Sequence, residues 1–263
     1  MATFSDGLPS PGARDEGFFL RAAMAMTLVL VAGFSVQLAM GRSSFSAPPV
    51  VHAHAVVFMG WVGIYLLQNI FVATGRVAQH RRLGWIAAVW VPAMVVLGCA
   101  VTIAIVRRGE VPFFFRPLQF LILDPLSLAT FVGLTTAAIM LRRQSDWHRR
   151  LHFCAMSVLL GPGLGRLLPM PLLVPWAWEA TLAVSLVFPV VGMWADRRRT
   201  GRVPPAWRWG VASVLGYLLL TEAITYSPVG VTIYEAVTAG SPGAAVAPLA
   251  FPAPPTGPAV VTG

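Results

Sequence analysis

The 263-residue chain contains 57% hydrophobic and only 11% charged residues, and its formal net charge at pH 7 is +9. Soluble domains contain roughly 45–50% apolar and about 25% charged residues, so this composition argues against a soluble protein. The positive charge alone would fit a nucleic-acid-binding protein. All nineteen basic residues are arginines, however, and most lie in a few connections between apolar segments, which makes nucleic acid the weaker interpretation.

Long apolar segments predict an all-α fold, a polytopic transmembrane bundle of about seven helices. Each segment has about the 20 residues that a helix needs to cross roughly 30 Å of hydrocarbon. No alternating ten-residue pattern indicates a membrane barrel, so the segments should be helices. In chain order they lie near residues 19–41, 50–74, 84–106, 117–141, 151–168, 176–195 and 208–228.

The two ends of the chain differ from this transmembrane domain, which we assign to residues 19–228. Residues 1–18 contain Asp6, Asp15 and Glu16, a poor match to the positively charged start of a cleaved secretory signal. We therefore expect a cytoplasmic N-terminal segment followed by a retained first helix. Residues 229–263 are rich in Pro, Ala and Gly, and this composition predicts a flexible tail.

The distribution of arginine predicts the orientation. The connections near residues 74–84, 141–151 and 196–208 hold twelve of the nineteen arginines, whereas the alternate connections hold five. The positive-inside rule places the first set and the N-terminus in the cytoplasm, and the C-terminus outside. We expect a multi-pass protein of the bacterial inner (cytoplasmic) membrane, with anionic lipid head groups at its arginine-rich rim.

A His-Arg-Arg-Leu sequence occurs twice, at 80–83 and 148–151, and each copy begins a predicted helix on the cytoplasmic side. His148 and His152 are four residues apart and share one helix face, and His80 enters the membrane from the same side. The three imidazoles are therefore candidates for convergence. Two histidines from different helices would suit the axial positions of a haem b, and all three would suit zinc or iron. The structural alternative is interfacial histidines that bond to backbone, lipid phosphate or each other.

A second group of ionisable residues is expected toward the outer leaflet, where buried charges are costly and often functional. The Gly161-Pro162-Gly163 sequence should interrupt the fifth helix near this group. A structural interpretation has Arg166 pairing with one of the glutamates, and Asp124 satisfying the helix turn that Pro125 disrupts. A functional interpretation is a proton or solute path in which acidic residues titrate. The group comprises His54, Asp124, Arg166, Glu179 and Glu222.

The order of several of these elements resembles a family of predicted bacterial membrane proteins known only as a domain of unknown function. The elements are His52 or His54, Gln68, the two His-Arg-Arg-Leu sequences and Arg166, within residues 50–172. In many members Trp-Met stands where this chain has Leu151-His152. The resemblance implies a four-helix membrane module and no established reaction.

Three functions remain open: a haem-binding or redox-linked protein, a proton-linked transporter and a metal-dependent membrane enzyme. The haem-binding and metal-dependent functions would use the histidine group, and the transporter would use the outer group. The chain contains no lysine, so a retinal protein that uses the usual Schiff base is excluded. Cys99 and Cys154 fall inside predicted helices and are not expected to form a disulfide.

Overall fold

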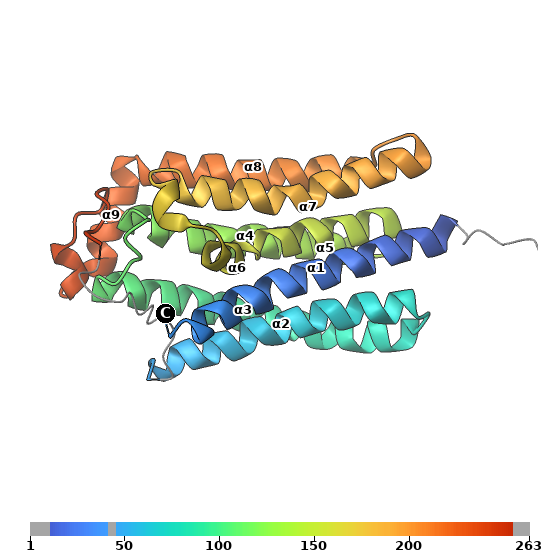
Figure 1. The fold of residues 1–263 in the computed structure, drawn as a ribbon, viewed down its shortest axis with the longest axis horizontal. Coiled ribbons are helices and arrows are strands. Elements are labelled where there is room, and N and C mark those ends of the chain that lie inside the picture. The colour runs from blue at the N-terminus through green and yellow to red at the C-terminus, as the bar shows by residue number, and fades with distance from the viewer. Residues whose placement is uncertain (1–10, 42–45, 255–263) are drawn as a thin grey trace, which may run out of the picture.

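The computed structural model describes residues 11–41 and 46–254, and its long helices run along one common axis (Figure 1). Proline occupies the first turn of several helices, where its missing N–H costs no helical hydrogen bond. The helices are α1 (Pro11–Ala39), α2 (Pro49–Ala73), α3 (Val77–Arg108), α4 (Pro117–Met140), α5 (Ser145–Val158), α6 (Gly161–Leu167), α7 (Ala177–Thr200), α8 (Pro205–Thr225) and α9 (Pro228–Thr238), with short 3-10 helices η1 (Met170–Leu173) and η2 (Pro242–Ala245).

Within the described residues, five helices are long and apolar enough to cross a membrane: α1 from Gly17 onward, α2, α3, α4 and α7. Helices α8 and α9 meet the same criterion only as a pair, and they are bent by 76° at the break between them. The predicted helix at 151–168 is divided into α5 and α6. The break precedes Gly161-Pro162-Gly163, and both residue types weaken a helix interior. The described residues are therefore all-helical, with five helices, or six with the bent pair, able to cross a membrane, and the predicted count of seven is not confirmed.

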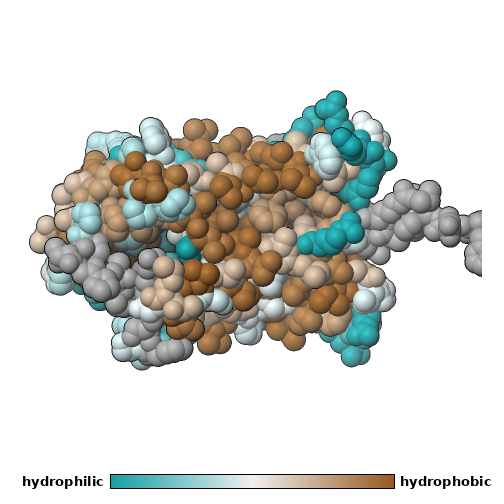
Figure 2. Space-filling view, in the orientation of Figure 1, coloured by the Kyte–Doolittle hydropathy of each residue, from teal (hydrophilic) through white to brown (hydrophobic). Residues whose placement is uncertain are grey.

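The connections α2–α3, α4–α5 and α7–α8 lie at the same end of the bundle as the start of α1 (Figure 1). We call this the arginine-rich end. Figure 2 shows hydrophilic residues gathered at this end and a broad apolar band across the middle of the bundle. Large apolar side chains face outward in the band; Trp85 and Val89 on α3 are 79% and 77% exposed. An outward-facing apolar band bounded by charged residues suits a lipid environment.

A buried ion pair connects three helices near the arginine-rich end. Nε of Arg150 on α5 lies 2.7 Å from Oδ2 of Asp196 on α7, and the two side chains are 3% and 1% exposed. The indole N–H of Trp207 on α8 donates to the same Oδ2 at 2.6 Å, while Arg199 pairs with the other carboxylate oxygen. Phe19 of α1 stacks on Trp207, with ring centroids 6.3 Å apart. One carboxylate therefore organises the contacts of α5, α7 and α8, and α1 packs on the same group.

The part of the chain that follows α8 is not the flexible tail that its composition predicted, as far as residue 254. Tyr234 of α9 is 3% exposed and packs in an apolar cluster with Val106 and Leu118. Nη1 of Arg107 donates to the carbonyl oxygen of Val237 at 2.6 Å, and the N–H of Leu118 donates to that of Pro248 at 2.9 Å. These tertiary contacts offset the weak structural preference of a Pro- and Ala-rich sequence. Residues 255–263 of the predicted tail, and residues 1–10 of the predicted N-terminal segment, lie outside the described residues.

We expect Asp196→Ala to lower the free energy of unfolding by about 3 kcal/mol, because its removal leaves the buried Arg150 with only the exposed Asp146 as counter-charge and the buried Trp207 N–H without its acceptor. Chemical denaturation in detergent micelles, followed by circular dichroism, measures this change. Arg197→Ala is the matched control, since Arg197 is an exposed residue of the same helix and should change the free energy by less than about 1 kcal/mol. Equal losses in the two variants would contradict the role given to the buried pair.

Candidate functional site

The three candidate histidines lie together at the arginine-rich end, as their spacing suggested. The ring centroids of His80 on α3 and His148 on α5 are 6.2 Å apart, and those of His148 and His152 are 4.8 Å apart. Both pairs meet edge to face, with interplanar angles of 89° and 86°. The i, i+4 spacing within α5 brings His152 beside His148. His80 joins them because the first turn of α3 lies beside α5.

The hydrogen bonds of this histidine group are incomplete. Nδ1 of His148 lies 2.8 Å from the carbonyl oxygen of Ala138, and a carbonyl only accepts, so Nδ1–H donates. Neutral His148 therefore keeps an acceptor at Nε2. Nδ1 of His80 and Oε1 of Gln68 on α2 make no hydrogen bond of good geometry, although the His80 ring lies within reach of the Gln68 backbone. Buried polar atoms without partners are uncommon and often mark a functional position, so this group remains a candidate site.

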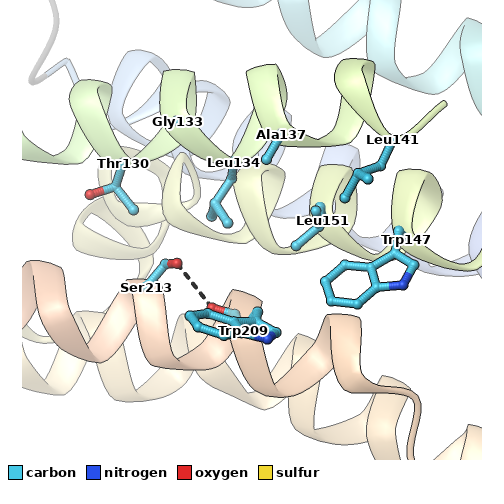
Figure 3. Close-up of a pocket in the computed structure, with 9 residues that line it drawn as sticks. All are labelled: Thr130, Gly133, Leu134, Ala137, Leu141, Trp147, Leu151, Trp209 and Ser213. Atoms are coloured by element: carbon cyan, nitrogen blue, oxygen red, sulfur yellow. Dashed lines mark hydrogen bonds between the residues drawn. The ribbon is translucent and has the colours of Figure 1, made fainter.

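The arrangement of these histidines gives no support to a bound metal or haem. Within residues 11–41 and 46–254, no group of three or more His, Cys, Asp or Glu side chains is placed to hold a metal ion. A haem needs a flat cavity beside its axial ligands. One cavity of about 320 Å³ lies between α4, α5 and α8 (Figure 3), and another of about 390 Å³ adjoins Trp194, Arg197 and Arg198. Neither of these two cavities is lined by a histidine.

At the opposite end of the bundle, Asp124 and Arg166 form the centre of the second group. Asp124 lies on α4, and its Oδ2 accepts a hydrogen bond from the hydroxyl of Thr102 on α3 at 3.0 Å. The Arg166 guanidinium on α6 is near enough to act on the charge of Asp124 and on that of His54 on α2. The ring of His54 stacks on Phe58, with centroids 4.1 Å apart, while its Nδ1 is buried without a partner. The structure thus brings together three of the five predicted residues.

Helix α6 carries Arg166, and two glycines allow it to approach α1 closely. A Cβ built on Gly33 would lie 2.4 Å from the carbonyl oxygen of Gly163, which is closer than real Cβ contacts allow. This approach places the Arg166 guanidinium 4.1 Å from the ring centroid of Phe34 on α1, a cation–π distance. Nη1 of Arg166 also donates to the carbonyl oxygen of Pro162 at 2.9 Å, in the first turn of α6.

The two glutamates form a separate group, which corrects the expected pairing with Arg166. Oε1 of Glu222 on α8 accepts hydrogen bonds from Nε2 of Gln119 at 3.0 Å and from the indole N–H of Trp178 at 2.9 Å. No ion pair joins Arg166 to Glu222 or Glu179, all of which are described residues. Glu222 acts electrostatically on Glu179 instead. Neutral donors from α4 and α7 satisfy Glu222, so arginine is not its partner.

The expectation for Asp124 also changes. Its carboxylate bonds to Thr102 of a neighbouring helix, whereas the hydroxyl of Ser127 donates to its main-chain carbonyl at 2.7 Å. The hydroxyl of Tyr217 on α8 donates to the next carbonyl back along the chain, that of Leu123, at 3.0 Å. Ser127 and Tyr217 therefore support the turn near Pro125, and the carboxylate does not.

Several partners were not identifiable as site residues from the sequence. Thr102, Gln119, Trp178 and Tyr217 stand in apolar segments, and nothing in their spacing indicates which acid or carbonyl they meet. Asp196 was placed in an arginine-rich connection, although α7 continues through it to Thr200. The only sequence feature that could have indicated a role for Asp196 is its position as a single acidic residue at the end of an apolar segment.

Comparison with known proteins gives no match: no protein-family model, no curated protein and no solved structure is detectably similar to the chain. The resemblance of residues 50–172 to an uncharacterised bacterial membrane family therefore stays a hypothesis.

We expect Gly33→Leu to separate α6 from α1, because its side chain would meet backbone atoms of Gly163 that have no freedom to rotate away. Thermal unfolding in detergent should show a clear decrease in Tm, in line with the 1–3 kcal/mol or so that overpacking costs. Gly63→Leu is the control, since a Cβ at Gly63 meets no heavy atom within 4 Å. A Tm equal to that of the control would show that the close approach is dispensable.

Proposed function

We propose that this chain is a proton-linked solute transporter in which Asp124 carries the coupled proton. The observation that carries the proposal is the position of Asp124 inside the apolar span α4, where its carboxylate bonds to Thr102 and Arg166, at the end of the interrupted α5–α6 segment, is near enough to act on its charge. Ionisable groups inside membrane spans commonly mark ion or substrate pathways. Interrupted helices in transporters commonly line the site and move between states.

The chemistry of the pair provides a simple coupling mechanism. Ionised Asp124 attracts Arg166 and accepts the Thr102 hydrogen bond, and both interactions favour the arrangement described above. Protonation removes the negative charge, so the attraction between Asp124 of α4 and Arg166 of α6 is lost. In the proposed mechanism α4 and α6 have two relative arrangements, one with Asp124 ionised and one with it protonated. A proton that binds one arrangement more tightly shifts the population toward it, as any ligand does. Glu222 is the candidate for a second acidic position, because Gln119 and Trp178 hold its carboxylate in the same half of the bundle.

The proposal includes a topology of seven crossings. Helices α5 and α6 together supply the fifth, and α8 supplies the seventh before the chain bends into α9. The N-terminus and the arginine-rich end face the cytoplasm, and the C-terminus faces outward, in a bacterial inner membrane. Anionic lipid head groups then surround the arginine-rich end. The location of the arginine-containing connections at one end of the bundle supports this orientation (Figure 1).

Haem binding and metal-dependent catalysis rank below transport. Both would use His80, His148 and His152, which lie together but adjoin neither of the two cavities. The Nδ1 of His80, which makes no hydrogen bond of good geometry, gives this group a more modest place in the transport proposal, as a proton acceptor near the cytoplasmic entrance.

We expect Asp124→Asn to abolish solute-driven proton movement, because an amide keeps the shape and the Thr102 hydrogen bond but does not exchange the proton. Proteoliposomes with an entrapped pH dye, challenged with a panel of amino acids, carboxylic acids, sugars and monovalent cations, measure the effect. Wild-type protein should respond to at least one class, and the variant to none.

Glu110→Gln is the matched control, since Glu110 is an exposed acid in the α3–α4 connection. It should retain the wild-type response, and both variants should show the same thermal stability as wild type. Normal proton movement by Asp124→Asn would refute the role of this carboxyl group, and a wild-type protein silent to every class would refute transport of those solutes.

A further inference from the structure

The cavity between α4, α5 and α8 is an apolar groove that none of the polar groups above uses (Figure 3). Leu134 of α4 and Leu151 of α5 contribute to its walls, and Gly133 leaves part of it open. A Cβ built on Gly133 meets no heavy atom within 4 Å, which places free space directly beside this residue. The volume of about 320 Å³ is within the range of small-ligand sites.

The groove offers hydrocarbon contacts rather than hydrogen bonds. Its two hydroxyl groups already donate to their own helices: Thr130 to the carbonyl oxygen of Leu126 at 2.8 Å, and Ser213 to that of Trp209 at 2.9 Å (Figure 3). The hydroxyl oxygens and the indole N–H groups of Trp147 and Trp209 are the few polar side-chain groups of the lining. Most of a polar ligand would therefore lose its hydration here without gaining partners, which costs free energy. The part of an occupant that enters the groove should therefore be a hydrocarbon chain.

Positive charge flanks one end of the groove. Leu141 and Trp209 line it, and they are the chain neighbours of the exposed residues Arg142 and Arg208. Arg143 follows Arg142 in the same connection and is also exposed. Figure 3 shows Trp147 and Leu141 toward this end, with Thr130 and Ser213 toward the other. Tryptophan at the boundary between apolar and charged zones is typical of the level of lipid head groups.

The acid nearest to this end in sequence does not cancel the charge. Asp146 pairs with Arg149 at 2.7 Å and with Arg150 at 2.9 Å, both on its own helix. The exposed arginines are therefore left with a local excess of positive charge. Charge complementarity selects an anionic head group as the partner.

We propose that this groove is a binding site for one anionic phospholipid, with an acyl chain against α4, α5 and α8 and its phosphate beside Arg142, Arg143 and Arg208. The site rests on the proposed membrane topology, which places these arginines at head-group level, but it is independent of proton-linked transport. Bound lipid would lie along the line where α4, α5 and α8 meet, and would add hydrocarbon contacts to those that the three helices already make.

Native mass spectrometry of the full-length protein in detergent tests the site, with phosphatidylglycerol and phosphatidylcholine titrated separately. Wild type should bind one phosphatidylglycerol more tightly than the next, and more tightly than phosphatidylcholine. Removal of Arg142 and Arg143 to alanine should weaken phosphatidylglycerol binding by about five-fold for each arginine and leave phosphatidylcholine unchanged.

Gly133→Leu should fill the groove without a clash and remove the first tight phosphatidylglycerol. Gly63→Leu, an equally open glycine on α2, should bind like wild type. Unchanged binding by Gly133→Leu, or equal affinity of wild type for the two lipids, would overturn the proposal. Because the assay uses no gradient or solute, failure of the lipid site is distinguishable from failure of the transport proposal.

Discussion

A polar side chain inside a membrane bundle has no water to bond, so its partner must come from another helix or from its own backbone. Three carboxylates of this protein follow that constraint. Asp124 bonds to Thr102 of α3, Glu222 bonds to donors of α4 and α7, and Asp196 bonds to Arg150 of α5 and Trp207 of α8. Each acid therefore connects the helices that supply its partners. The apolar surfaces between these contacts add packing area, but apolar packing does little to select one neighbouring helix over another.

The interruption between α5 and α6 follows from the same constraint. A proline and several glycines weaken the helix there, and the close approach of α6 to α1 at Gly163 and Gly33 compensates for the lost regularity. The result is a short helix that carries Arg166 to a position where it interacts with Asp124 and His54. A charged residue on a short, separate helix is well suited to respond to the charge of its partner.

The two polar groups at opposite ends of the bundle have different chemistry. The histidine group at the arginine-rich end contains imidazole and amide groups with incomplete hydrogen bonding. The group around Asp124 contains opposite charges in the apolar region, where electrostatic interactions are weakly screened. Only the second group has a charge that a single proton would cancel. This difference places the coupling step with Asp124 and leaves the histidines a supporting role in the proposal.

The sequence by itself determined the membrane-spanning, all-helical character and the convergence of the three histidines. Hydropathy depends on local composition, and the i, i+4 spacing of His148 and His152 is a property of one helix. Only the tertiary structure decided that Arg166 interacts with Asp124 rather than pairing with a glutamate, that Asp196 holds three helices together, and that residues 229–254 pack. Those outcomes depend on which helix faces lie in contact, and contacts between residues as distant as Arg107 and Val237 leave no periodic signal in the chain.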